Sequence, residues 1–168
     1  GVTGAWPAFA EVAKTQNLPA LGLPLTLVVH VMTFGIGEET GWRGFALPRL
    51  QARHDALRAT LLLSVGWALW HVPSFFGNSG FADLGPVDIV GWFIGLVLGA
   101  IFLTWLYNST RGSLIAIVLW HGLFNALVAS EAAAGLIAAV MTTGIMVFAI
   151  VALIRGGGRN LTGLGGPS

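Results

Sequence analysis

Six polar or charged side chains stand inside otherwise apolar stretches of this sequence, and their types suit acid–base chemistry. They fall in three short motifs: Glu38, Glu39 and Arg43 in EETGWR, His71 in WALWH, and His121 and Asn125 in HGLFN. An ionisable group at the centre of a membrane helix costs roughly 2.5–3.5 kcal/mol on insertion scales, so such groups are functional candidates by default. We therefore take these six residues as the starting point for a functional site.

Helical spacing separates a structural role from a chemical one. Glu39 and Arg43 are four residues apart with the acid first, which is the favourable order for an ion pair, and we expect them to support the site as a clamp. Glu38 is then left unpaired on an adjacent face, as a candidate general base. His121 and Asn125 are also four residues apart and share a helix face. Their side chains could together donate hydrogen bonds to an oxyanion.

The depth of the motifs in a membrane predicts that they meet. Glu38, His71 and His121 each lie ten to thirteen residues from an arginine near one end of their segment: Arg49, Arg58 and Arg111. At a rise of about 1.5 Å per residue, this places all three about 15–20 Å from the same face of a hydrocarbon core about 30 Å thick. Trp67, four residues before His71, could shield that histidine from lipid. His30 has no motif around it, and we expect a buried, hydrogen-bonded histidine there.

The elements that must position these residues are membrane helices. Of 168 residues 55% are hydrophobic and 9% charged, and the mean hydropathy is +0.82, which a soluble fold of this size could not bury. The sequence predicts an all-α, polytopic transmembrane bundle of about five spanning helices with its active site in the core. The segments cover about 20–48, ending near Pro48, then 57–76, 89–107, 113–130 and 133–154. A net charge of +1 gives no indication of a nucleic-acid partner.

Three regions follow along the chain, with one orientation in the bilayer. We expect an N-terminal interfacial segment over 1–19, the transmembrane core over 20–154 with its motifs within 38–125, and a flexible Gly-rich tail over 155–168. Arginines mark alternate connections and the tail, so the positive-inside rule puts the N-terminus of this chain outside and its C-terminus in the cytoplasm. Gly91, Gly95 and Gly99 have GxxxG spacing, which favours close helix packing.

The three motifs together resemble those of the CPBP family, the CAAX-protease and bacteriocin-processing (Abi) membrane proteins, which is similar to the type II CAAX prenyl endopeptidases. The family pattern is EExxxR, then an aromatic residue followed by xxxH, then HxxxN, and it covers about half of this chain, from Glu38 to Asn125. One departure is Trp67, where the family commonly has Phe, an exchange of aromatic residues that we expect to be minor. Five segments are fewer than many members have, so further helices upstream stay an open question.

The resemblance implies an intramembrane endopeptidase that acts on a peptide or membrane-protein substrate within the bilayer. Carried over by position, Glu38 and His71 would activate a water, and His121 and Asn125 would stabilise the oxyanion. The cofactor is zinc or none. Glu38, His71 and His121 could supply a two-histidine, one-carboxylate zinc set, although HExxH is absent, and a water held between Glu38 and His71 needs no metal. Whether the substrate is prenylated is left open.

Two other functions compete with proteolysis. A proton-coupled transporter also uses buried Glu and His, but it needs a polar path to both faces, and the segments 89–107 and 133–154 have few polar residues. A non-catalytic scaffold or immunity protein of the same fold would tolerate Glu38→Ala. Neither alternative explains three ordered motifs as well as a peptidase does.

Overall fold

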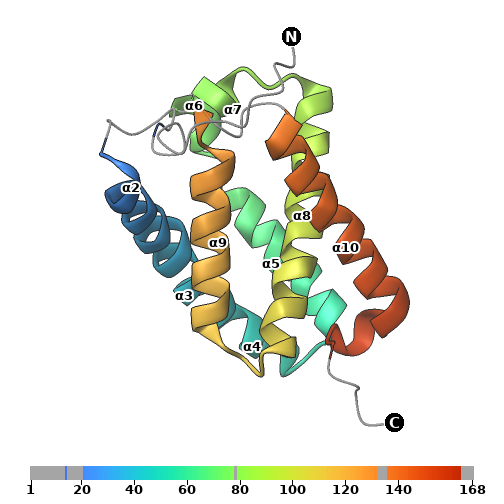
Figure 1. Cartoon of the computed structure of the whole chain (residues 1–168). Coiled ribbons are helices and arrows are strands. Elements are labelled where there is room, and N and C mark those ends of the chain that lie inside the picture. The colour runs from blue at the N-terminus through green and yellow to red at the C-terminus, as the bar shows by residue number, and fades with distance from the viewer. Residues whose placement is uncertain (1–13, 15–20, 78, 132–135, 164–168) are drawn as a thin grey trace.

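The computed structural model describes residues 14, 21–77, 79–131 and 136–163, and this part of the chain is a bundle of helices (Figure 1). The predicted all-α class is confirmed. The predicted interfacial segment 1–19 lies outside the described residues except for Lys14. Five helical runs correspond to the five predicted segments, and short turns or one-turn helices join them.

The first run is helical from Leu23 to Gln51 and changes hydrogen-bond register along its length. It consists of α2 (Leu23–His30), η1 (Val31–Glu38), α3 (Glu39–Gly41), η2 (Trp42–Ala46) and α4 (Leu47–Gln51), where η marks π-helical turns. The prediction that this helix ends near Pro48 is wrong by three residues. Pro48 stands in the first turn of α4, directly after the π-helical turn η2, and the helical run continues past it to Gln51.

The remaining runs form the rest of the bundle. They are α5 (Ala56–Trp70), the short α6 (Ser74–Gly77) and α7 (Ser79–Ala82), α8 (Pro86–Ser109), α9 (Leu114–Val128) and α10 (Leu136–Asn160). The Asp55 carboxylate caps α5 by accepting the Arg58 N–H at 2.8 Å. The helix α5 ends just before His71, because Pro73 cannot continue the hydrogen-bond ladder. His71 therefore occupies the C-terminal end of α5 rather than its middle.

Within the part of the chain that the structure describes, three helical stretches are long and apolar enough to cross a membrane. They are Ala56–Gly77, Pro86–Ser109 and Ile137–Asn160, and α9 is a shorter apolar helix of 15 residues. The α2–α4 run carries the charged residues of the first motif. Large apolar side chains cover the outer surface, including Phe76, Val87 and Ile154, which are each more than three-quarters exposed in the isolated chain. Such a surface suits lipid rather than water, and the chain is an integral membrane protein.

Two glycines let the first run pack directly on α9. A Cβ on Gly35 would lie 2.5 Å from the Val118 carbonyl oxygen, and one on Gly122 would lie 2.6 Å from the Cα of Val31. The two backbones therefore cross at a distance that only glycine permits. This crossing brings the first motif, which begins at the last residue of η1, beside the third motif on α9.

The glycines with GxxxG spacing are not sites of close helix packing. A Cβ added to Gly91, Gly95 or Gly99 would meet no atom within 4 Å, and all three line a cavity instead. The prediction of close packing at this stripe is wrong. The absence of side chains on this face of α8 leaves space beside the helix.

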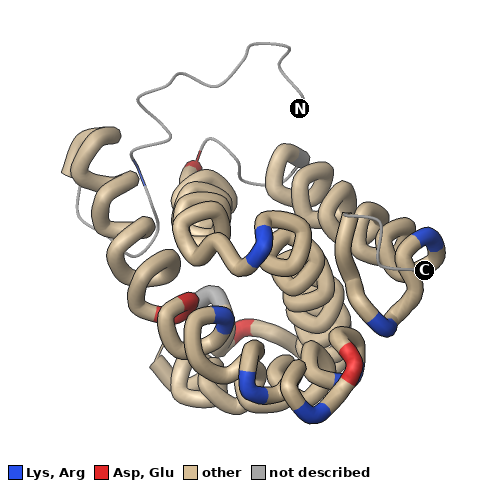
Figure 2. Tube along the Cα trace, turned by 90° about the horizontal axis from the view of Figure 1, so that it is seen from below, with Lys and Arg blue, Asp and Glu red and all other residues tan. Residues whose placement is uncertain are grey.

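The end of the bundle that holds α4, the start of α5, the α8–α9 connection and the end of α10 carries the arginines of the loops (Figures 1 and 2). They are Arg49, Arg53, Arg58, Arg111, Arg155 and Arg159. Of the tail predicted over 155–168, the structure describes residues 155–163. Gly157 breaks α10 with φ +63°, and the chain then turns back so that Leu161 is fully buried and the Gly163 N–H donates to Ser109 Oγ at 2.7 Å.

Candidate active site

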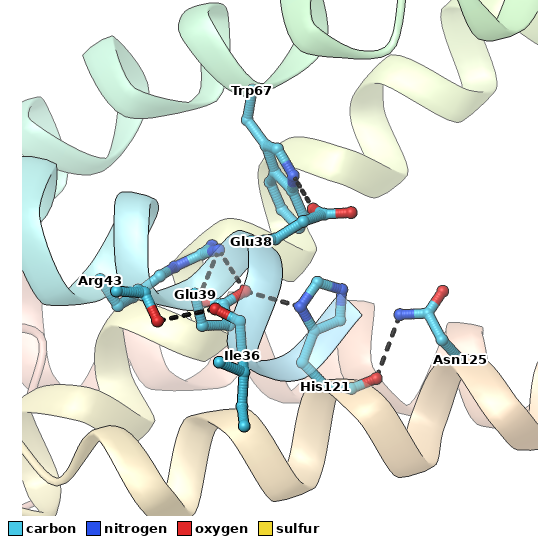
Figure 3. A network of polar contacts seen from close by, with 8 residues as sticks. Ile36, Glu38, Glu39, Arg43, Trp67, His121 and Asn125 are labelled. Carbon is cyan, nitrogen blue, oxygen red and sulfur yellow. Dashed lines mark hydrogen bonds and ion pairs between the residues drawn. The ribbon is translucent and has the colours of Figure 1, made fainter. Parts of the chain in front are cut away.

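Trp67 on α5 joins the three motifs. Its indole Nε1–H donates to Oε2 of Glu38 at 2.8 Å (Figure 3), and its carbonyl oxygen lies 2.7 Å from Nδ1 of His71. Its ring packs edge-on against His121, with centroids 5.6 Å apart, and the Arg43 guanidinium lies 4.5 Å from the indole centroid. The predicted convergence of the motifs is therefore present, and one aromatic side chain mediates much of it.

The ion pair expected between Glu39 and Arg43 is present, and a third side chain joins it. Nη1 of Arg43 donates to both Glu39 oxygens at 2.8 and 3.1 Å, and both side chains are fully buried. Nδ1 of His121 lies 2.6 Å from Oε1 of the same carboxylate, although the ring N–H does not point along the line between the two atoms. Glu39 thus faces a cation and a histidine from two different helices (Figure 3). Its negative charge is compensated without solvent, as a buried carboxylate requires.

His71, His121 and Asn125 line one cavity of about 360 Å³ between α5, α8, α9 and α10. Asn125 uses one amide N–H to bond the His121 carbonyl at 3.1 Å, and an amide group has a second N–H to donate. The walls are otherwise mostly apolar and aromatic, with the glycine stripe of α8 on one side. A few convergent polar groups in an apolar cavity are typical of a ligand or active site.

The ring orientations define which nitrogen of each histidine remains available. A carbonyl only accepts hydrogen bonds, so His71 Nδ1 carries hydrogen against Trp67, and Nε2 of the neutral ring is an acceptor. His121 turns Nδ1 to Glu39, and its other ring nitrogen points to the side on which Asn125 lies (Figure 3). Both histidines therefore have one nitrogen fixed by the protein and the other left for chemistry.

Glu38 is placed differently from the other candidates. It is half-buried and lines a separate recess with Trp42 and Trp70, so its link to His71 runs through Trp67. Its second carboxylate oxygen points away from Trp67, to the side of Asn125 (Figure 3). That oxygen is the one left to contact a water or a substrate.

The zinc alternative lacks a ligand set. It would need Glu38, His71 and His121 around one ion, but among the described residues no three His, Cys, Asp or Glu side chains are grouped closely enough to hold a metal. Glu38 is engaged by the Trp67 N–H, and His121 faces Glu39. The residues present do not fit zinc in this arrangement, and we derive no step through a metal.

Sequence reasoning missed the aromatic cluster around the second histidine. Phe81 and Trp92 approach the His71 ring with centroids 6.1 and 5.5 Å away, and Phe75 packs against both of them. Nothing in the sequence separates these rings from the many other apolar residues of a membrane protein. The expectation for His30 is confirmed, because it is buried and its Nδ1 lies 2.9 Å from the Thr26 carbonyl.

Fold and site together define a class: an all-α membrane protein with a buried polar cluster at the meeting point of its helices. A family model described as type II CAAX prenyl endopeptidase Rce1-like matches residues 20–127, and the chain belongs to this family. The chain is 32% identical over 105 residues to CAAX prenyl protease 2 of Methanococcus maripaludis. The alignment covers 60% of this chain and 38% of that relative, so the chain spans well under half of the relative's length. No solved structure gives a significant match.

Proposed function

We propose that this chain carries the active site of an intramembrane endopeptidase that hydrolyses a peptide bond with a water activated by Glu38 and His71. The observation that supports this most strongly is the set of contacts around Trp67, which tie the carboxylate of one motif to the histidine of another beside a cavity. Family membership supports the reaction class. The relative's name, CAAX prenyl protease 2, supports a C-terminal prenylated peptide as one substrate to test.

The reaction would proceed by direct attack of water. The water oxygen bonds to the scissile carbonyl carbon while one of its protons passes to the Glu38 carboxylate, and Nε2 of His71 accepts a hydrogen bond from the same water. A base placed in this way contributes typically 10²–10⁴-fold to a rate. When the C–N bond breaks, the leaving nitrogen takes the proton from Glu38, and the second water proton leaves with the new carboxyl group.

His121 and Asn125 would hold the oxyanion that forms on the scissile carbonyl. Asn125 offers its free amide N–H, and His121 offers the ring nitrogen that faces away from Glu39. To act as a donor, that nitrogen must carry a hydrogen, while Nδ1 stays beside the Glu39 carboxylate. Donors fixed before the reaction, in a site closed to water, stabilise developing charge at little reorganisation cost.

The substrate would reach the site as an apolar segment in the bilayer. The cavity walls contributed by Trp92, Leu96 and Phe124 are apolar, and the polar side chains that line the cavity besides the proposed site residues are few. The clustering of loop arginines at one end supports the orientation in which that end, with the C-terminus, is cytoplasmic and the N-terminus of this chain is outside.

The test is cleavage by purified protein in liposomes, in water enriched in ¹⁸O. The substrates are a farnesylated C-terminal CAAX peptide and the same peptide without the lipid. We expect a product whose new carboxyl group contains one ¹⁸O, formed by the wild type and by protein treated with a zinc chelator. Cleavage of the lipidated peptide alone would define a prenyl-dependent enzyme. Folded protein that cleaves neither peptide would contradict the proposal, and proton flux in its place would favour the transporter.

A further inference from the structure

The indole N–H of Trp67 donates a hydrogen bond to Glu38 that no other aromatic side chain of this size could donate. A backbone carbonyl is present at every residue, so the contact from Trp67 O to His71 Nδ1 does not depend on the type of side chain. The bond from Nε1 to Glu38 Oε2, at 2.8 Å, depends on it completely, because among aromatic side chains of this size only tryptophan has a ring N–H at that edge. The indole is buried, so the bond is shielded from competing water.

We propose that Trp67 is a positioning residue for the hydrolysis, which fixes one oxygen of Glu38 through its indole N–H and leaves the other oxygen directed at the attacking water. This inference rests on the proposed function of Glu38. Glu38 is half-exposed, at the end of a π-helical turn, and belongs to a flexible side-chain type. Without a donor to hold it, its carboxylate would sample several rotamers, and only some of them would keep the second oxygen on the side of Asn125.

The contacts around Trp67 hold its own ring in one orientation. Arg43 lies against the ring face at 4.5 Å, and His121 packs on it edge-on. Glu39 in turn binds Arg43 and faces His121. The buried clamp therefore holds the ring from two sides, and the fixed ring in turn holds Glu38 through the indole N–H. Contacts therefore run from Glu39 to Arg43, from Arg43 to Trp67 and from Trp67 to Glu38. Through them, Glu39 positions Glu38.

The decisive variant replaces the indole N–H without changing the size of the ring. β-(3-Benzothienyl)alanine, introduced at position 67, has sulfur in place of the N–H and otherwise keeps the bicyclic shape. Trp67→Phe is the companion variant, which also removes the N–H but leaves space beside Arg43. Trp105→Phe is the matched control, because Trp105 packs on Phe102 and Phe148 and lines neither the cavity beside His71 nor the recess beside Glu38.

We expect both Trp67 variants to lower kcat about tenfold or more, because a hydrogen bond to a charged group is among the stronger contacts that a side chain makes. KM should change by less than about twofold, and the analogue should keep the wild-type Tm, since packing is preserved. Trp105→Phe should keep wild-type kinetics. A merely structural Trp67 would show the opposite result, with a lower Tm for Trp67→Phe and wild-type kcat for the analogue, and that outcome would overturn the inference.

A second readout follows the hydrogen bond itself and does not need substrate. In protein labelled with ¹⁵N-tryptophan, the indole resonance of Trp67, assigned by its loss in Trp67→Phe, should move upfield in Glu38→Ala, while that of Trp105 stays in place. A Trp67 resonance that does not move would overturn the inference whatever the kinetics show. Glu38→Gln with wild-type turnover would overturn the proposed function and the inference with it. Unchanged turnover in the analogue beside an inactive Glu38→Gln protein would overturn the inference alone.

Discussion

The region around Glu39 and the region around Glu38 contain the same kind of side chain, one residue apart, in opposite environments. Glu39 is fully buried and meets Arg43 and His121, so its charge is compensated within the protein. Glu38 is half-buried, and the bond that Trp67 donates to it occupies one of its oxygens. The comparison shows that partners, rather than residue type, decide whether a carboxylate in such a bundle is enclosed by charge or bound at one oxygen only.

The largest effect should come from breaking the buried ion pair between Glu39 and Arg43. Arg43→Ala leaves the buried Glu39 without its cation, and removal of one partner from a buried ion pair costs about 3–5 kcal/mol. We expect a strong loss of folded protein and a lower Tm in detergent. Arg49→Ala is the control, because Arg49 is exposed near the end of the same helical run and lies over Phe45. Normal yield of an inactive Arg43→Ala protein would move Arg43 into the chemistry.

A smaller effect, confined to turnover, should follow from a change at Asn125, which lines the cavity. Asn125→Ala removes one proposed oxyanion donor, and the loss of one such donor typically costs about 10²–10³-fold in kcat. KM should stay close to the wild-type value, because the contact forms mainly in the transition state. Steady-state kinetics in liposomes would measure both constants. If kcat is kept while KM rises by the same factor, Asn125 binds substrate instead of the oxyanion.

The sequence predicted the helical class, the approximate segments and the meeting of the three motifs, because apolar length and helical spacing are local properties. It identified the Glu39–Arg43 pair from their four-residue separation. It could not show that His121 would join this pair, since that contact depends on the crossing of η1 and α9 at Gly35 and Gly122. Spacing alone also gave no means of telling those two closely packed glycines from the stripe on α8.

Trp67 shows the same limit at the level of one side chain. The exchange of Phe for Trp was expected to be minor, because both residues are aromatic and suit a membrane helix. The structure shows that Trp67 adds a donor that Phe lacks and that this donor reaches Glu38. The π-helical turns that contain Glu38 and Arg43 were equally invisible in the sequence, and they set the faces on which these two side chains emerge.

The two neighbouring glutamates provide the most direct test, as the matched substitutions Glu38→Gln and Glu39→Gln in otherwise identical protein. Both substitutions remove one negative charge and keep the shape of the side chain. The measurement is kcat per folded molecule together with Tm. We predict that Glu38→Gln loses about a thousandfold in kcat at an unchanged Tm, whereas Glu39→Gln lowers the Tm through its effect on Arg43. A Glu38→Gln protein that is fully active per folded molecule would contradict the account.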